Sequence, residues 1–167
     1  MASRSRITTT RLETPLIAFR IADGHYPLLD GTGAALLGGR WNSPGRRATY
    51  GALSYAGALL ERLAQSGIGT VPRDQQWIEI TIPAGTTVEE VMVADLPGWD
   101  APDRQASRAF GDRWYDQRRS LVLIVPSVVG QPHEHNLLLD QEHPEFATVR
   151  ATAPRPVIWD ERHFGGR

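Results

Sequence analysis

Apolar residues along this chain fall into short runs that are separated by stretches rich in glycine, proline and charged residues. Gln76–Pro83 alternates apolar and polar side chains, which predicts a strand with one solvated face. Pro15–Ala22 and Ser120–Val129 are more continuously apolar, and short runs of this kind predict buried strands. Three weaker segments are also predicted to be strands: Thr86–Val93, His135–Asp140 and Pro154–Asp160.

Two segments have helical periodicity. Ser54–Gln65 begins with a residue type that caps helix N-termini and is followed by Gly67, a residue type that ends helices. In Asp103–Arg119, apolar residues recur at four-residue steps, as they do on one face of a helix. Because predicted strands and helices do not alternate regularly, the pattern favours an α+β fold over a doubly wound parallel sheet.

We expect one compact domain over residues 15–167, with a mixed, mostly antiparallel β core and flanking helices. Residues 1–14 are polar and lack periodicity, so they are predicted to be a flexible arm. The length of 167 residues suits a single domain, because typical domains contain roughly 100–200 residues.

A glycine-rich segment lies between the first predicted strand and the first predicted helix. Residues 23–50 contain six glycines and two prolines, which predicts a long loop with one helical turn at Gly33–Leu37. Within it, Gly39 and Arg40 belong to the sequence LLGGRWNSPG. Two interpretations stay open. One is a tight turn with a surface arginine, and the other is a loop whose glycines admit an anion that Arg40 binds.

Composition and charge exclude several kinds of site and partner. The formal net charge is −1, which argues against nucleic acid as the main partner. The chain has no cysteine, so disulfides, thiolate metal sites and cysteine nucleophiles are excluded. It has no apolar run of signal-peptide length near its N-terminus and none approaching the about 20 residues of a membrane helix. We therefore expect a cytoplasmic protein that acts away from membranes.

The first predicted helix carries a candidate catalytic carboxylate. On a helical wheel extended back to Tyr50, an apolar core face is formed by Leu53, Ala56, Leu59, Leu60 and Leu63. A separate stripe of small and polar residues is made up of Tyr50, Ser54, Gly57 and Glu61. Small residues in such a stripe leave room for a ligand beside the backbone. The alternative is a solvent-exposed side of the helix on which Glu61 faces water.

Further positions carry candidate chemistry. Arg20 interrupts the first apolar run, where a charge is costly unless it is paired or faces a cleft; a surface ion pair is the alternative. Ser127 follows the most apolar predicted strand, where a hydroxyl can face a ligand, although it lies outside the G-x-S-x-G pattern of hydrolases. His133 and His135 lie at i, i+2 without a third ligand at a zinc spacing, so we predict no metal site.

These segments together resemble a known family. Their order is AFRI, DGTGAALLGGRWNSPG, ATY, ALLE, VPSVV, HNLLLD and EHPEF, over Leu16–Phe146. The set is similar to the RES-domain toxins, which are the toxin halves of bacterial type II toxin–antitoxin pairs and are named for an arginine, a glutamate and a serine. One departure is local: the family tends to have N-P-x-H-P where this chain has Asp140–Pro144.

The resemblance implies a fold similar to that of ADP-ribosyltransferase toxins, with NAD⁺ as substrate and no metal. Matched position by position, it implies that Glu61, Arg20 and Ser127 are catalytic. It implies an NAD⁺-binding set that consists of Arg20, Gly39, Arg40, Tyr50, Ser127 and Asn136. In this assignment the arginines bind the pyrophosphate, Tyr50 stacks on the nicotinamide, and Glu61 contacts the ribose.

The implied function is cleavage of the nicotinamide–ribose bond of NAD⁺ and transfer of ADP-ribose to a protein acceptor. Transfer to water or phosphate, which depletes cellular NAD⁺, is the alternative within the family. The implied protein partner is a cognate antitoxin. Two other classes stay open from the residues alone: a metal-dependent hydrolase built on the histidines, and a non-enzymatic module that binds a phosphorylated ligand or a protein through the arginine loop.

Overall fold

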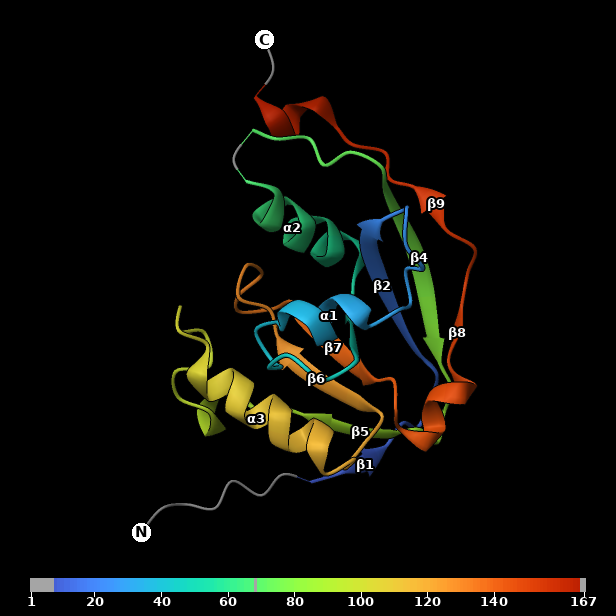
Figure 1. Ribbon diagram of the computed structural model, residues 1–167, viewed down its shortest axis with the longest axis vertical. Coiled ribbons are helices and arrows are strands. Elements are labelled where there is room, and N and C mark those ends of the chain that lie inside the picture. The colour runs from blue at the N-terminus through green and yellow to red at the C-terminus, as the bar shows by residue number, and fades with distance from the viewer. Residues whose placement is uncertain (1–7, 68, 166–167) are drawn as a thin grey trace.

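The chain folds around one nine-stranded sheet that is flanked by helices (Figure 1). This computed structural model describes residues 8–67 and 69–165. The strands are β1 Thr10–Arg11, β2 Leu16–Asp23, β3 Ala48–Ala52, β4 Gln75–Ile82, β5 Thr87–Glu90, β6 Val122–Pro126, β7 His135–Asp140, β8 Arg150–Ala151 and β9 Arg155–Pro156. The α-helices are α1 Thr32–Leu37, α2 Tyr55–Ser66 and α3 Gln105–Asp116, and the 3-10 helices are η1 Val93–Asp95, η2 Pro144–Thr148 and η3 Glu161–Phe164.

The strand order is β1-β5-β6-β7-β3-β2-β4-β8, with β9 also paired to β4. All neighbouring strands are antiparallel except β5 and β6, which are parallel. The longest pairing joins β2 to β4, from Leu16 opposite Ile82 to Asp23 opposite Gln75. This mixed, mostly antiparallel sheet with flanking helices confirms the α+β prediction.

The apolar pattern explains the central strands. In β4, Ile78, Ile80 and Ile82 are buried while Glu79 and Thr81 between them are only partly buried, so the predicted alternation corresponds to two faces of the sheet. The continuous run in β6 is buried at nearly every position, because β6 lies between β5 and β7. Local pattern and position in the sheet therefore agree.

The ends of α2 were predicted correctly, but its buried face was not. The Ser54 hydroxyl accepts a hydrogen bond from the backbone N of Gly57 at 2.9 Å, and Gly67 has φ +83° just after the last turn. Gly57 and Ala58 are buried. Of the residues predicted as core, Ala56 and Leu60 are exposed, and Leu53, Leu59 and Leu63 are partly buried. The small-residue side of the helix faces the protein because the segment between β6 and β7 packs against it.

Aromatic residues form a core beneath the glycine-rich loop. Trp41 is buried and stacks on Trp99 with ring centroids 6.3 Å apart, and Phe110 meets it edge-on at 6.4 Å. Trp114 of α3 completes this cluster on one side of the sheet. The loop that carries Gly39 and Arg40 is therefore attached to α3 through Trp41.

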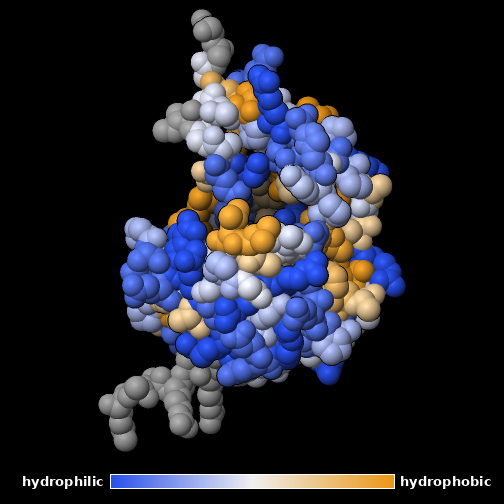
Figure 2. All heavy atoms as spheres, viewed as in Figure 1, coloured by the Kyte–Doolittle hydropathy of each residue, from blue (hydrophilic) through white to orange (hydrophobic). Residues whose placement is uncertain are grey.

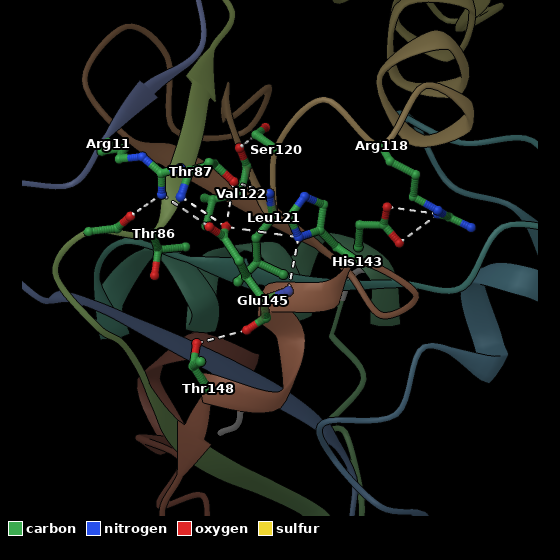
Figure 3. Close-up of polar contacts among 12 residues, drawn as sticks. Arg11, Thr86, Thr87, Arg118, Ser120, Leu121, Val122, His143, Glu145 and Thr148 are labelled. Carbon is green, nitrogen blue, oxygen red and sulfur yellow. Dashed lines mark hydrogen bonds and ion pairs between the residues drawn. The ribbon is translucent and has the colours of Figure 1, made fainter.

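Polar contacts tie the turn after β7 to β1 and β5 (Figure 3). Glu145 accepts hydrogen bonds from the backbone N and Oγ1 of Thr87 at 3.0 and 2.5 Å and pairs with Arg11 at 3.2 Å. Nearby, Nη1 of Arg118 donates to both oxygens of buried Asp140 at 2.9 and 2.7 Å. Burial raises the pKa of Asp140, and the Arg118 charge opposes that rise. Asp140 stands first in the segment that departs from N-P-x-H-P, and the arginine holds it there.

The predicted arm differs from the structure where it is described. Thr10 and Arg11 pair with Val88 and Thr87, so this part of the arm is an edge strand of the sheet. Residues 1–7 of the predicted arm lie outside the described residues. The Thr86–Val93 and Pro154–Asp160 predictions were too long, because only four and two of their residues pair in the sheet. No helix within the described ranges is long and apolar enough to cross a membrane.

Candidate active site

Three predicted site residues meet in one hydrogen-bonded group centred on Glu61. The Ser127 hydroxyl donates to Oε1 of Glu61 at 2.8 Å, and Nδ2 of Asn136 donates to the same oxygen at 2.6 Å. These partners lie 66 and 75 residues from Glu61 in the sequence. The structure thus brings together a carboxylate, a hydroxyl and an amide that the sequence placed on separate elements.

Sheet pairing positions the two donors. Asn136 lies in β7, where it pairs with Val125 of β6 and with Ala52 of β3. Ser127 directly follows β6, and its side chain is almost fully buried. Because β6 and β7 are adjacent and antiparallel, the end of one strand and the start of the other lie together beside α2. The strand-end position of Ser127 was therefore a useful signal.

The two carboxylate oxygens of Glu61 differ in their hydrogen bonding. Both donors reach Oε1, and no group among residues 8–67 and 69–165 hydrogen-bonds to Oε2. Two donors on a single oxygen fix the rotation of the carboxylate, so that the direction of Oε2 is set before any ligand arrives. The side chain is partly exposed. A ligand with hydroxyl donors can therefore bind Oε2 without displacing Ser127 or Asn136.

Arg20 points from β2 toward the backbone of the glycine-rich loop. Its Nε donates to the carbonyl of Leu28 at 2.5 Å, and its Nη1 donates to the carbonyl of Tyr50 at 2.7 Å. Burial lowers the pKa of Arg20 to about 10, although the charge of Asp30 opposes this effect. Arg20 thus ties the loop to β3. The surface ion pair considered as its alternative is absent among the described contacts.

Arg40 contacts the segment that precedes α3. Its Nη1 donates to the carbonyls of Trp99 and Ala101 at 3.3 and 3.0 Å. Partial burial lowers the pKa of Arg40 and nearby Arg104 adds to this effect, while negative charges including that of Glu61 oppose it. Arg40 therefore lies within the electrostatic influence of the candidate catalytic carboxylate.

Packing against Tyr50 and Asn42 requires a glycine at position 39. A Cβ at this position would lie 2.5 Å from the Tyr50 hydroxyl and 3.0 Å from Oδ1 of Asn42. The Tyr50 hydroxyl donates to that Oδ1 at 2.6 Å and accepts from the backbone N of Trp41 at 3.1 Å. The glycine thus makes room for Tyr50, whose hydroxyl holds the loop from beneath.

Tyr50 is a residue of β3 and not of the helix, so the predicted stripe was wrong in its first half. Ser54 is the N-cap of α2, and only Gly57 and Glu61 lie within the helix. A Cβ on Gly57 would be 2.7 Å from Oε2 of Glu134. The space beside Gly57 is therefore filled by a side chain of this protein rather than left open for a sugar. The helical wheel was wrong before Ser54, because residues up to Ala52 belong to β3 and α2 begins only at Tyr55.

Tyr50→Phe is expected to lower the free energy of unfolding by about 1–3 kcal/mol, because it leaves the amide of Trp41 and the buried Asn42 without this partner. Burial raises the pKa of Tyr50 well above its ordinary value. Above about pH 10 the phenol ionises in the unfolded state only, so the unfolded state binds fewer protons and stability falls. The advantage of the native protein over Tyr50→Phe should therefore shrink as the pH rises past 10.

Urea denaturation of the native protein and of Tyr50→Phe between pH 8 and pH 11 measures this difference in free energy of unfolding. Tyr26→Phe is the matched control, because that side chain is 70% exposed. Equal stability of all three proteins at pH 8 would contradict a structural role for the Tyr50 hydroxyl.

Glu134 was missed by the sequence analysis. Its carboxylate accepts a hydrogen bond from the Ser54 hydroxyl at 2.6 Å, and it lies two residues before Asn136. In the same short segment the sequence indicated His133, His135 and Asn136 but not Glu134. In the structure, Nδ1 of His135 lies 3.1 Å from the carbonyl of His133, and no group of three or more metal-binding side chains occurs in the described ranges.

One face of the molecule is hollowed. Figure 2 shows a depression between the parts of this face formed by α2 and α1, with an apolar patch at its edge. Leu36 and Leu37 of α1 are 71% and 81% exposed, and α1 buries no residue. A separate open cavity of about 330 Å³ is lined by Leu29, Asp30, Arg47, Gln141, Glu142 and Phe146 and contains none of the predicted site residues.

Comparisons with known proteins agree on one family. A family model described as the RES domain matches residues 17–160. The chain is 37% identical over 138 residues to a "Prs ADP-ribosylating toxin" of Sphingobium sp. (strain YBL2), covering 80% of this chain and 85% of that protein. It is 33% identical over 144 residues to a "Toxin Res" of Photorhabdus laumondii, covering 84% and 91% of the two chains.

A solved structure shares the fold. The chain resembles one in the crystal structure of the M. tuberculosis MbcT–MbcA toxin–antitoxin complex with a TM-score of 0.72, covering 93% of this chain and 90% of that one. The sequence identity is 16%, so this likeness concerns the arrangement of helices and strands alone.

Proposed function

This chain belongs to the RES domain family, and we propose that it is the toxin of a toxin–antitoxin pair that cleaves the nicotinamide–ribose bond of NAD⁺ and transfers ADP-ribose to a protein acceptor. The observation that carries the proposal is the convergence of Ser127 and Asn136 on one oxygen of Glu61. The name of the Sphingobium relative, an ADP-ribosylating toxin, supports the reaction class.

Cleavage of the nicotinamide–ribose bond does not require a covalent intermediate with the protein. Nicotinamide is a neutral leaving group when its bond to ribose breaks, and the sugar passes through an oxocarbenium-like transition state. A fixed carboxylate beside the ribose stabilises the positive charge that develops there. In this proposal Oε2 of Glu61 accepts hydrogen bonds from the ribose hydroxyls, while Ser127 and Asn136 hold the carboxylate in place.

The remaining predicted residues bind and orient the substrate. Arg40 has nitrogens beyond those bonded to Trp99 and Ala101, and these bind the pyrophosphate. Arg20 shapes the site by fixing the loop, and in this proposal its Nη2 binds the same anion. Tyr50 borders the loop, the residue is partly exposed, and in this proposal its ring stacks on the cationic nicotinamide.

A cognate antitoxin is the proposed protein partner. The exposed apolar pair Leu36 and Leu37 of α1 suits contact with a protein, because large exposed apolar side chains that lie together commonly mark such surfaces. An antitoxin seated there would restrict entry to the site. No metal takes part in this proposal.

Incubation of the purified protein with NAD⁺ tests the proposal. We expect nicotinamide release, measured by chromatography, in three arms: buffer alone, buffer with phosphate, and bacterial protein extract with NAD⁺ labelled in its ADP-ribose part. Label on a protein supports the transferase proposal. Free ADP-ribose or its phosphate in place of labelled protein would replace it with a glycohydrolase or phosphorylase, and no release in any arm would refute cleavage of NAD⁺.

Arg40→Ala is expected to raise KM for NAD⁺ by about 10- to 100-fold, because a charge-assisted contact to phosphate contributes roughly 1.5–3 kcal/mol. The kcat should change less, because the pyrophosphate is held equally in the bound and transition states. Initial rates of nicotinamide release over a range of NAD⁺ concentrations separate the two constants.

Arg113→Ala is the matched control, since Arg113 is an exposed arginine of α3. An unchanged KM in Arg40→Ala would remove Arg40 from the binding set.

A further inference from the structure

The connection between β6 and β7 is attached to α2 by two matching hydrogen bonds. Ser127 donates to Glu61 of the helix at 2.8 Å, and Ser54 at the helix N-cap donates to Glu134 of the connection at 2.6 Å. Each partner thus contributes one serine and one glutamate. The helix pair and the connection pair are both seven residues apart in sequence, so the two bonds clasp the connection at both of its ends.

Internal hydrogen bonds make the connection a closed unit. The backbone N of Ser127 donates to the carbonyl of Glu134 at 3.0 Å, and the backbone N of Glu134 donates to the carbonyl of Gly130 at 3.0 Å. The backbone N of Gly130 donates to the Ser127 hydroxyl at 3.0 Å. A Cβ on Gly130 would lie 2.4 Å from Cβ of Glu134. Movement of Glu134 is therefore transmitted directly to Ser127.

The carboxylate of Glu134 occupies a place made for it at the start of α2. Gly57 leaves the space, since a Cβ there would be 2.7 Å from Oε2 of Glu134. The Ser54 hydroxyl accepts from the backbone N of Gly57 and donates its single proton to Glu134. The first turn of a helix favours a negative charge in this position. The Ser54 hydroxyl and the space beside Gly57 thus both accommodate the Glu134 carboxylate.

We propose that Glu134 is a positioning residue that holds Ser127 against Glu61 by anchoring the β6–β7 connection to the N-terminus of α2. This inference rests on the proposed function in one respect: the aligned pair is the one that acts on NAD⁺. Without the anchor, the single bond between Ser127 and Glu61 would have to hold the connection alone. Reaction rates are sensitive to misplacement of about 1 Å, so loosening should lower kcat more than it raises KM.

Substitution at Glu134 separates positioning from proton transfer. Glu134→Gln keeps an oxygen that accepts from Ser54 but cannot take up a proton, whereas Glu134→Ala removes the acceptor. We expect kcat for nicotinamide release to fall about 10- to 100-fold in Glu134→Ala and to be largely recovered in Glu134→Gln. Glu90→Ala, at an exposed glutamate of β5, should match the native protein.

A kcat in Glu134→Ala equal to that of the native protein would overturn the proposal. Equal loss in the alanine and glutamine variants would overturn it as well, because the charge rather than the hydrogen bond would then matter.

A second measurement does not depend on activity. Amide hydrogen exchange, followed by NMR, reports the opening of the hydrogen bonds at Ser127 and Gly130. Both amides should exchange at least about 10-fold faster in Glu134→Ala than in Glu134→Gln, while amides of the central strand β6 keep their rates. If the native protein releases no nicotinamide, the proposed function fails and the exchange rates still decide the anchor. An exchange rate of the Ser127 amide that is the same in Glu134→Ala as in the native protein would overturn the proposal that Glu134 anchors the connection.

Discussion

Glu61→Gln should lower kcat for nicotinamide release on the order of 100- to 1,000-fold, a loss typical for removing one preorganised electrostatic contact to a transition state. The glutamine oxygen can still accept from Ser127 and Asn136, so the side chain stays in place. Its amide nitrogen then stands where Oε2 of the carboxylate was. A nitrogen donor cannot accept the ribose hydroxyls or stabilise positive charge on the sugar.

Single-turnover and steady-state assays with NAD⁺ measure this effect. Glu90→Gln provides the matched control, because it makes the same change of charge at an exposed position on β5. Thermal denaturation should show that Glu61→Gln remains folded, since both hydrogen bonds to Oε1 are retained. Native-level kcat in the folded variant would exclude Glu61 as the group that acts on the ribose.

Gly111→Ala should destabilise the fold by about 3 kcal/mol or more, because the added methyl group meets backbone rather than a flexible side chain. A Cβ at Gly111 would lie 1.7 Å from the carbonyl oxygen of Trp41. Relief requires α3 to move away from the loop, which breaks the packing of Trp41 on Phe110 and the bond from Nε of Arg108 to the carbonyl of Gly39.

Chemical denaturation of the native protein and of Gly111→Ala gives the difference in their free energies of unfolding. Gly33→Ala in α1 is the control, because nothing lies within 4 Å of a Cβ at that position, and alanine is favoured over glycine in helices by up to about 1 kcal/mol. An equal free energy of unfolding for Gly111→Ala and the native protein would show that α3 does not pack on Trp41 as described.

Much of the fold was predictable because it depends on local pattern. The alternation in Gln75–Ile82 and the apolar run before Pro126 each specify a strand without reference to the rest of the chain. Ser54 and Gly67 mark the two ends of α2 for reasons of backbone hydrogen bonding and conformation that act within one turn. Very short strands such as Thr10–Arg11 carry no such pattern, because pairing with β5 alone makes them strands.

The site was predictable only in part. Glu61 is indicated by its place on a predicted helix and Ser127 by its place at a strand end, whereas Asn136 is indicated only by the family resemblance. The structure brings the three into contact. Glu134 had no periodic signal, because its role depends on the Ser54 hydroxyl, 80 residues away in the sequence.

The sequence by itself determined the longer elements β2, β4, β6, β7, α2 and α3, and where α2 begins and ends, because burial periodicity and capping act over a few residues. Only the tertiary structure decided which face of α2 is buried, why Gly39 and Gly57 are glycines, and that one oxygen of Glu61 is held while the other is available. Those properties depend on where β6 and β7 place Ser127, Glu134 and Asn136. Side chains that are distant in sequence meet only after the sheet has set the strand order and register.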